Sequence, residues 1–289
     1  MKHLLILSLL ISFNGISQQD PLTSFYWNNY SFFNPAMSGV AHKHEANVTW
    51  RNQWDKVNGA PNSLFVNYGM NLAEKHGIGV NYLYETIGFS KVNQLKVNYN
   101  YQLKLDENKK LAFGTALNFQ NLAMNPIWIF PDNPNDPSLP AATSTNNYGV
   151  DLGIAYYGNK LIAGIGVTQI TLNQSPVTSS SGASYNTAPY AYANLRYEAD
   201  FMSESKFIFE TQARTDFVKY SIDINVGYNW KDILQGGIGY RTSDAINVNL
   251  TGIIAKKYRV GYAYDMTINK LSNISRGTHE ITLGLRLPN

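Results

Sequence analysis

The sequence contains no cysteine, few histidines and few charged residues. Among its 289 residues there is no Cys, there are five His, and 15% are charged, where ordinary globular domains have roughly 25%. The absence of Cys excludes a disulfide scaffold, a cysteine nucleophile and thiolate metal ligands. A net charge of +3 is too small to imply a nucleic-acid partner. We therefore expect neither an enzyme nor a protein that holds a metal or another cofactor.

Long apolar runs are also missing after residue 17. The chain begins with Lys2 and His3, continues with an apolar stretch at residues 4–13, and has Gly15 and Ser17 at the −3 and −1 positions of a cleavage site. About 10 apolar residues are too few to cross a bilayer as a helix, which needs about 20. This pattern is typical of a secretory signal peptide. We expect residues 1–17 to be removed by cleavage near Ser17, and the mature chain to begin at residue 18.

The dominant positive feature is period-two alternation. In residues 94–105 every second residue is Leu, Val or Tyr, and the residues between them are Gln, Lys or Asn. Only a β-strand places two such sets on opposite faces. The polar face carries Asn, Gln, Thr and Gly with scattered charges, and the apolar face carries Tyr or Trp near strand ends, as at membrane interfaces. The pattern favours an outer-membrane barrel with a polar lumen over a soluble sandwich.

Alternating segments recur along the whole mature chain. Connections after even-numbered segments are short, and the long ones, at 123–146, 173–187 and 268–276, all follow odd-numbered segments. Bacterial barrels have an even number of strands, short periplasmic turns and longer surface loops. We therefore predict an all-β fold, an antiparallel transmembrane β-barrel of about 14 strands. The expected strands are 44–55, 62–73, 76–86, 92–105, 110–122, 147–157, 160–172, 188–199, 205–215, 219–230, 233–242, 245–255, 257–267 and 277–287.

The first long loop, residues 123–146, has five prolines, which cannot pair in a sheet. It also has an apolar run that contains Trp128 and Phe130, and such a run is costly in water unless it meets a partner, lipid or the barrel interior. An ordinary surface loop is the simplest interpretation. The alternative is a partner contact or a lid over the barrel mouth, made by Trp128 and Phe130. The loop at 173–187, rich in Ser and Gly, is typical of a flexible linker.

The segment at residues 18–41 is aromatic and lacks the alternation. It leads through Phe25-Tyr26-Trp27 and Phe32-Phe33 into Asn34-Pro35-Ala36 and Gly39. With the motifs that follow it, the sequence resembles the PorP/SprF family of type IX secretion system outer-membrane proteins of Bacteroidota. The further motifs, in order, are Arg51-Asn52-Gln53-Trp54, Gly237-Ile238-Gly239-Tyr240-Arg241, Gly261-Tyr262-Ala263-Tyr264-Asp265 and Gly277-Thr278-His279-Glu280-Ile281.

The resemblance implies a fourteen-stranded, non-enzymatic barrel in the outer membrane. Its expected partners are outer-membrane lipid, other components of the type IX secretion system and a cognate secreted protein, such as an adhesin, that it helps to export or attach to the cell surface. A porin or small-solute channel with the same fold is the alternative function. The domains expected are the signal peptide at 1–17, an N-terminal segment at 18–41 that is periplasmic or a plug, and the barrel at 42–289.

Two motif arginines, Arg51 and Arg241, fall on the polar faces of their strands. They could belong to a structural ion-pair lattice, because charges buried in a barrel must be paired, or they could bind a ligand. The acids considered as their partners are Glu85, Asp151, Glu210 and Asp223.

The other motif residues also have alternative interpretations. Asn34, Pro35 and Gly39 most simply form a turn, and the alternative is a plug in which the aromatic run packs inside the barrel. His279 and Glu280 are adjacent in one strand and therefore point to opposite faces, so they cannot act together as an acid/base pair.

Overall fold

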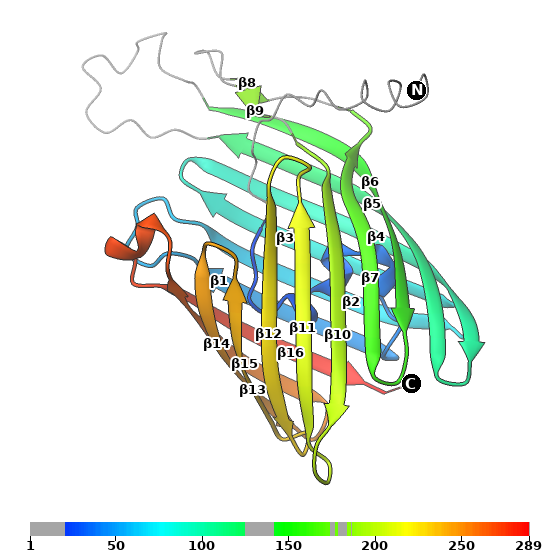
Figure 1. Cartoon of the computed structure of the whole chain (residues 1–289). Helices are drawn as coiled ribbons and strands as arrows, with labels where there is room; N and C mark the ends of the chain where they lie inside the picture. The colour runs from blue at the N-terminus through cyan, green and yellow to red at the C-terminus, as the bar shows by residue number, and fades with distance from the viewer. Residues whose placement is uncertain (1–20, 125–141, 174–176, 179–183, 186, 289) are drawn as a thin grey trace, which may run out of the picture.

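In the computed structural model, the structure describes residues 21–124, 142–173, 177–178, 184–185 and 187–288. Fourteen strands of these residues form a closed antiparallel barrel in which β1 pairs with β16 (Figure 1). The predicted fold is confirmed. The barrel strands are β1 (His44–Asn52), β2 (Asn62–Ala73), β3 (His76–Ile87), β4 (Ser90–Asp106), β5 (Lys109–Met124), β6 (Thr143–Tyr157), β7 (Leu161–Thr171), β10 (Tyr190–Asp200), β11 (Lys206–Thr215), β12 (Tyr220–Trp230), β13 (Leu234–Arg241), β14 (Ala245–Ile254), β15 (Tyr258–Thr267) and β16 (Thr278–Leu287).

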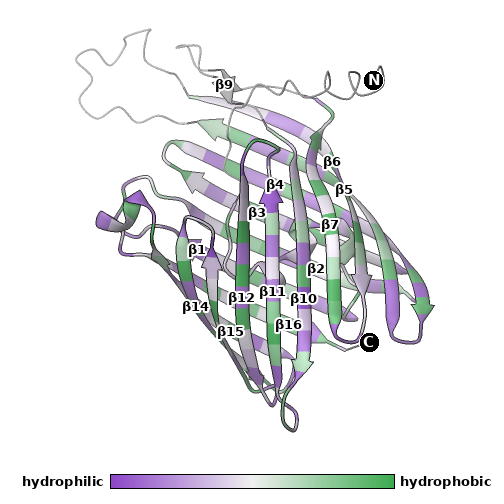
Figure 2. Ribbon diagram, in the orientation of Figure 1, coloured by the Kyte–Doolittle hydropathy of each residue, from purple (hydrophilic) through white to green (hydrophobic). Residues whose placement is uncertain are grey.

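The barrel is apolar outside and polar inside. In β4, Val97 and Tyr99 are 46% and 44% exposed, whereas Lys96, Asn98 and Asn100 are buried. The same alternation of hydrophilic and hydrophobic residues is visible along the strands in Figure 2. An exposed apolar band around a polar interior is the arrangement of a barrel surrounded by lipid. No helix in the described part of the chain is long and apolar enough to span a membrane.

The connections differ between the two ends of the barrel. One end, called here the short-turn end, has turns of two to five residues, at 74–75, 107–108, 158–160, 201–205, 231–233 and 255–257. The other, the loop end, has every long connection, together with three short ones at 88–89, 216–219 and 242–244. Because short turns face the periplasm in bacterial barrels, the loop end faces the cell exterior.

Several local expectations from the sequence are wrong. Strand β6 begins at Thr143 instead of residue 147, so the loop before it is shorter than the expected 123–146. Strand β1 ends at Asn52 instead of residue 55, because Trp54 and Lys56 have positive φ angles of 52° and 72°, outside the extended region. The β4–β5 hairpin is longer than expected at both ends. The loop at 173–187 is not a plain linker, since β8 (Val177–Thr178) pairs with β9 (Ser184–Tyr185). Trp128 and Phe130 lie outside the described residues.

Residues 21–40 lie inside the barrel, and this segment is called the plug. It consists of η2 (Tyr26–Asn28), α2 (Tyr30–Phe33) and η3 (Pro35–Met37). Its aromatic residues form a buried cluster with side chains of the barrel wall, which confirms the plug interpretation of the N-terminal segment. In Figure 1 the plug is the blue segment within the barrel.

The plug has a defined direction. Leu22 lines the same cavity as Trp54, Asn269 and Leu271, which lie at the loop end. His42, just after the plug, lies at the short-turn end, where β1 begins. The chain therefore passes through the lumen from the loop end to the short-turn end before it enters the barrel wall.

Candidate functional site at the plug and barrel wall

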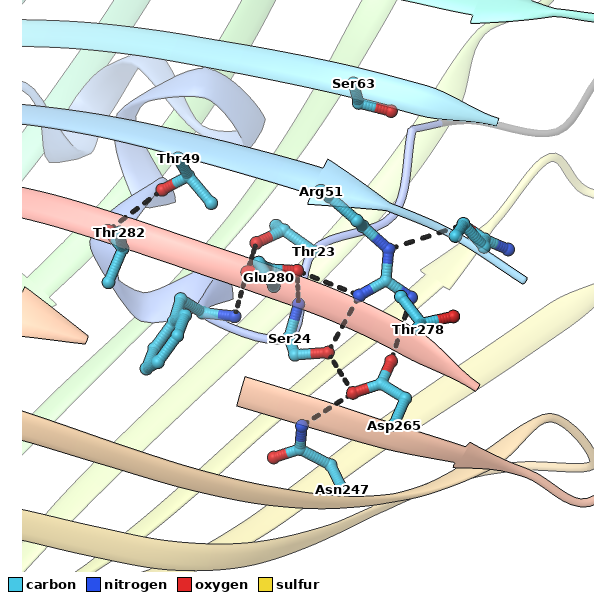
Figure 3. A network of polar contacts seen from close by, with 12 residues as sticks. Thr23, Ser24, Thr49, Arg51, Ser63, Asn247, Asp265, Thr278, Glu280 and Thr282 are labelled. Carbon is cyan, nitrogen blue, oxygen red and sulfur yellow. Dashed lines mark hydrogen bonds and ion pairs between the residues drawn. The ribbon is translucent and has the colours of Figure 1, made fainter. Parts of the chain in front are cut away.

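A single carboxylate holds the first residues of the plug at the loop end. Glu280 on β16 is fully buried. Its oxygens accept hydrogen bonds from the Thr23 hydroxyl at 2.6 Å, from the backbone N–H of Ser24 at 2.8 Å and from that of Phe25 at 2.9 Å. Arg51 on β1 donates from Nη1 to the same carboxylate at 2.8 Å (Figure 3). Glu280 thus joins the plug to both strands of the seam at which the barrel closes.

Asp265 on β15 extends this network to the next strands. It accepts hydrogen bonds from the Ser24 hydroxyl at 2.6 Å, from Arg51 Nη2 at 2.8 Å and from Asn247 Nδ2 at 2.6 Å (Figure 3). Arg241 Nη1 lies 3.2 Å from it. Charge-assisted hydrogen bonds are shorter and stronger than neutral ones. The start of the plug is therefore held by an ionic cluster that spans β1, β13, β15 and β16.

The partners of the two arginines agree only in part with the expected ones. Arg241 pairs with Asp223, as expected, at 2.6 Å, and also with Asp244 and Asp265 at 3.2 Å. Arg51 pairs instead with Asp265 and Glu280, which the sequence marked as motif residues but not as its partners. The other acids considered contact different groups: Glu85 accepts from Ser63, Asp151 pairs with Lys96, and Glu210 pairs with Arg196.

The Asn34-Pro35-Ala36 motif lies against a surface of the wall formed by glycines. A Cβ on Gly153 would lie 2.0 Å from Asn34 Oδ1, and one on Gly114 would lie 2.1 Å from Ala36 N. Gly164 and Gly166 are similarly close to the motif. Because any side chain at these positions would overlap the plug, only glycine lets it approach this closely. Strands β5, β6 and β7 therefore form what we call the glycine shelf.

Asn34 itself links the plug to two strands of this shelf. Its Nδ2 donates to the carbonyl oxygens of Ile154 and Ile165, each at 3.1 Å, and its Oδ1 accepts from the Ala36 N–H at 3.0 Å. The last bond caps η3, whose first residue is Pro35. The motif therefore forms a turn, and that turn is part of the plug.

The end of the plug is held by β4 and packs closely against β2. Asn98 Nδ2 donates to the Ser38 hydroxyl at 2.7 Å, and Gln102 Nε2 donates to the Gly39 carbonyl at 3.2 Å. Gly39 has a φ of +61°, and a Cβ there would lie 2.2 Å from the Met70 carbonyl oxygen. Both the left-handed backbone and the close approach require glycine.

Lys96 fixes the middle of the plug. It is buried, its Nζ lies 2.8 Å from Asp151 Oδ2 and 2.9 Å from the Phe32 carbonyl oxygen, and it lies 4.1 Å from the centre of the Phe32 ring. The ammonium thus combines an ion pair, a hydrogen bond to the plug and a cation–π contact. No sequence motif marks Lys96 for this role.

The remaining motif residues face outward or lie at the loop end. His279 Nδ1 lies 2.7 Å from the Tyr262 hydroxyl on the outer face, opposite the buried Glu280, as the alternation predicted. Tyr240 is 44% exposed. The Tyr264 hydroxyl donates to the Arg276 carbonyl oxygen at 3.1 Å. Trp54 donates its backbone N–H to Thr278 Oγ1 at 3.0 Å.

The site thus contains paired charges, small polar groups and glycines packed against a chain segment. No group of three or more His, Asp or Glu in the described part of the chain could hold a metal. The arrangement resembles an intramolecular protein–protein interface, in which a segment of short helical turns is held by a polar lumen.

Residues 15–285 match the family model described as "Type IX secretion system membrane protein PorP/SprF". The chain belongs to the PorP/SprF family. Membership implies an outer-membrane barrel that associates with type IX secretion components, and both family and fold point to a non-enzymatic protein. In this PorP/SprF barrel, four residues that the motifs marked, Arg51, Arg241, Asp265 and Glu280, come together around the start of the plug.

Several solved outer-membrane proteins share the barrel fold of this PorP/SprF chain. They are the CymD monoaromatic hydrocarbon channel (10% identity, 91% of this chain and 93% of that chain, TM-score 0.53), a Pseudomonas aeruginosa FadL homologue (10%, 90% and 94%, TM-score 0.52) and Acinetobacter baumannii Omp33 (9%, 86% and 100%, TM-score 0.51). At such identities the likeness shows the fold alone. No curated protein sequence matches the chain.

Sequence reasoning missed Thr23, Ser24, Lys96 and the glycine shelf of this PorP/SprF barrel. Thr23 and Ser24 precede the aromatic run and carry no motif of their own. The shelf glycines lie inside strands, and the sequence of those strands does not show which segment packs against them. Alternation does place Asp265 and Glu280 on lumenal faces, which is the signal that could have made them partners of Arg51.

Proposed function

We propose that this barrel is a partner protein of the type IX secretion machinery that helps to export, or to attach to the cell surface, one cognate secreted protein such as an adhesin. The observation that carries the proposal is the plugged lumen of a PorP/SprF-family barrel. A segment held by Glu280, Asp265, Asn34 and Lys96 gives the barrel the rigidity of an anchoring platform, and its loop end offers the surface from which a secreted protein could be held.

The second candidate function is a diffusion channel for small solutes. It is favoured by the shared fold with the CymD channel, but the plug opposes it, because its aromatic cluster occupies part of the lumen. The two functions predict different conductance. A partner barrel should conduct little in planar bilayers, and a variant that lacks residues 21–40 should conduct strongly. Steady, large conductance of the intact protein would favour the channel.

The cargo proposal is tested in a deletion strain. Loss of the gene should remove one large protein from the cell surface, measured by protease shaving and mass spectrometry, and the intact gene should restore it. As a control, a variant that carries Glu107→Gln in an exposed turn should restore it equally well. If every surface protein remains and only the uptake of a small solute is lost, the proposal is wrong.

We also propose that the loop between β5 and β6 contributes to partner contact through Trp128 and Phe130. The loop connects strands at the loop end, where a secreted protein would be met. A Trp128→Ala/Phe130→Ala variant should assemble normally and lose most of the surface-attached cargo. Ile274→Ala, an exposed apolar residue in another loop, is the matched control. Equal cargo levels in both variants would count against this role.

Finally, we propose that residues 1–17 are a signal peptide that is cleaved near Ser17. The proposal is supported by the apolar stretch at residues 4–13 and by Gly15 and Ser17 at the −3 and −1 positions of the cleavage site. N-terminal sequencing of the protein purified from outer membranes should begin at Gln18. A chain that retains residue 1 would refute the cleavage.

A further inference from the structure

A cavity of about 310 Å³ lies at the short-turn end of the lumen, opposite to the ionic cluster that holds the start of the plug. It is bounded by the plug and by strands on both sides of the barrel. Its size is at the lower end of the range for small-molecule sites, about 300–1,000 Å³. Its cationic residues are Arg196, Lys206, Arg259 and Arg286.

Three of these four cations already have counter-charges. Arg286 Nε donates to Glu45 at 2.7 Å, and its Nη2 donates to Asn28 of the plug at 3.2 Å. Arg196 pairs with Glu198 and Glu210, and Lys206 Nζ lies 3.0 Å from Glu198. In this second group two cations face two carboxylates, so the charges balance.

Arg259 on β15 differs from the others. It forms no ion pair with the described residues, and its Nε, which is buried, has no hydrogen-bond partner among them. Arg259 lies opposite Gly284, two residues from Arg286 on the neighbouring strand, so a second cation is close. Asp232, the remaining carboxylate of the lining, is exposed in the turn at 231–233. The buried Nε of this half-buried guanidinium lacks compensation for the water it has lost.

The rest of the lining indicates the kind of anion. One uncompensated guanidinium can balance one negative charge. A dianion would bring a second negative charge near the carboxylates of Glu45 and Glu198, and no further unpaired cation of the lining would balance it. Trp27, Tyr30 and Tyr157 supply aromatic surface beside the charged groups, as in sites that bind an apolar body and orient it by a few polar contacts.

We propose that this cavity binds a carboxylate that is carried by a small aromatic or aliphatic body, with the Arg259 guanidinium as its principal ligand. The site opens at the periplasmic end and is independent of the proposed cargo role, because none of its residues belongs to the loop end. The carboxylate could come from a free small acid or from the end of a peptide chain.

The test uses the intact detergent-solubilised barrel and benzoate as the probe. Benzoate should raise the unfolding temperature saturably and change the fluorescence of Trp27, whereas benzylamine, a cation of similar shape, should not. Arg259→Gln should weaken benzoate binding at least about tenfold, because a charge-assisted bond is lost. Arg276→Gln, an exposed arginine at the loop end, is the control and should bind benzoate like the wild type.

Two further arms complete the experiment. Acetyl-glycyl-phenylalanine represents the end of a peptide chain. If it binds more tightly than benzoate, and its C-terminal amide does not bind, the ligand is a peptide chain end. If benzoate binds more tightly, the ligand is a free small acid. If Arg259→Gln fails to fold, the test uses the fluorescence of the protein with its native Arg259. A saturable fluorescence change on benzoate addition supports the site if Trp27→Phe abolishes it and Trp230→Phe preserves it. Equal responses to benzoate and benzylamine, or no saturable response, would overturn the proposal.

Discussion

Arg51 Nη1 lies 2.8 Å from Glu280 Oε2, and these two residues are directly paired across the seam between β1 and β16. Glu280 also accepts two backbone N–H groups and one hydroxyl of the plug. The same carboxylate therefore joins the first strand, the last strand and the plug. One ion pair thus takes part both in closing the barrel and in seating the start of the plug.

Replacing that carboxylate should weaken the barrel strongly. Glu280→Gln leaves Arg51 with one counter-charge fewer in a fully buried site, and removing one partner of a buried pair costs about 3–5 kcal/mol. We expect a clearly lower temperature for the loss of the compact band in heat-modified gel electrophoresis. Glu107→Gln, in an exposed turn, should leave that temperature unchanged. Equal temperatures for the two variants would show that the seam pair does not stabilise the barrel.

Filling the glycine shelf should displace the plug. In Gly114→Ala the new methyl group would lie 2.1 Å from Ala36 N, and because the clash is with backbone, the plug must move. Overpacking of this kind costs about 1–3 kcal/mol. We expect higher conductance in planar bilayers and a lower unfolding temperature. Gly252→Ala on β14 is the control, since its Cβ would meet only the Val260 carbonyl oxygen, at 3.9 Å. If Gly114→Ala conducts no more than Gly252→Ala, the shelf does not seat the plug.

Lys96 should be needed for stability because it balances the buried charge of Asp151. Lys96→Met would leave the Asp151 carboxylate buried without its cation, and we expect a loss of about 3–5 kcal/mol in the free energy of unfolding. The double variant Lys96→Met/Asp151→Asn removes both charges and should recover much of this loss. Urea titration of the folded barrel in detergent measures all three proteins, with Lys91→Met at an exposed position of β4 as the control. A double variant as unstable as the single one would rule out an unpaired charge as the cause.

His42 should make stability depend on pH. Burial lowers the pKa of His42, which lies between the plug and β1, below its usual value of about 6.5. The unfolded chain therefore binds more protons than the folded one as the pH falls through that value, so stability decreases toward acid. We expect the unfolding temperature to be lower at pH 5 than at pH 8, and His42→Gln to reduce this difference. His279→Gln, on the outer face, should keep it; a difference unchanged by His42→Gln would exclude this residue as its source.

The strands could be predicted because their information is local. In residues 94–105 each strand face has one kind of residue, and a period of two admits no other regular structure. The error at the end of β1 has a local cause as well: Trp54 continues the apolar pattern, but its φ of 52° shows that the chain has already turned. Alternation indicates which face of a strand a residue occupies, but it does not indicate the residue at which the strand ends.

The candidate site could be predicted only in part because its contacts are long-range. Asn34 donates to the carbonyl oxygens of Ile154 and Ile165, which are more than a hundred residues away in the sequence. No local pattern near Asn34 predicts such long-range contacts. The motif residues were recognisable as a group, but their division into lumenal charges such as Asp265 and outward rings such as Tyr264 follows from strand parity. The sequence did not reveal that the plug adds hydroxyl and backbone N–H donors to the carboxylates among those charges.

The direction of the plug also decides on which sides of the membrane the two ends of the described chain lie. Fourteen strands alone would return the chain to the side from which it started. The plug adds one further passage through the same bore, so the chain passes from one end of the barrel to the other an odd number of times. Residue 21 consequently lies on the cell-surface side and residue 288 on the periplasmic side. A tag placed just before the plug would face the exterior, whereas a tag after residue 288 would face the periplasm.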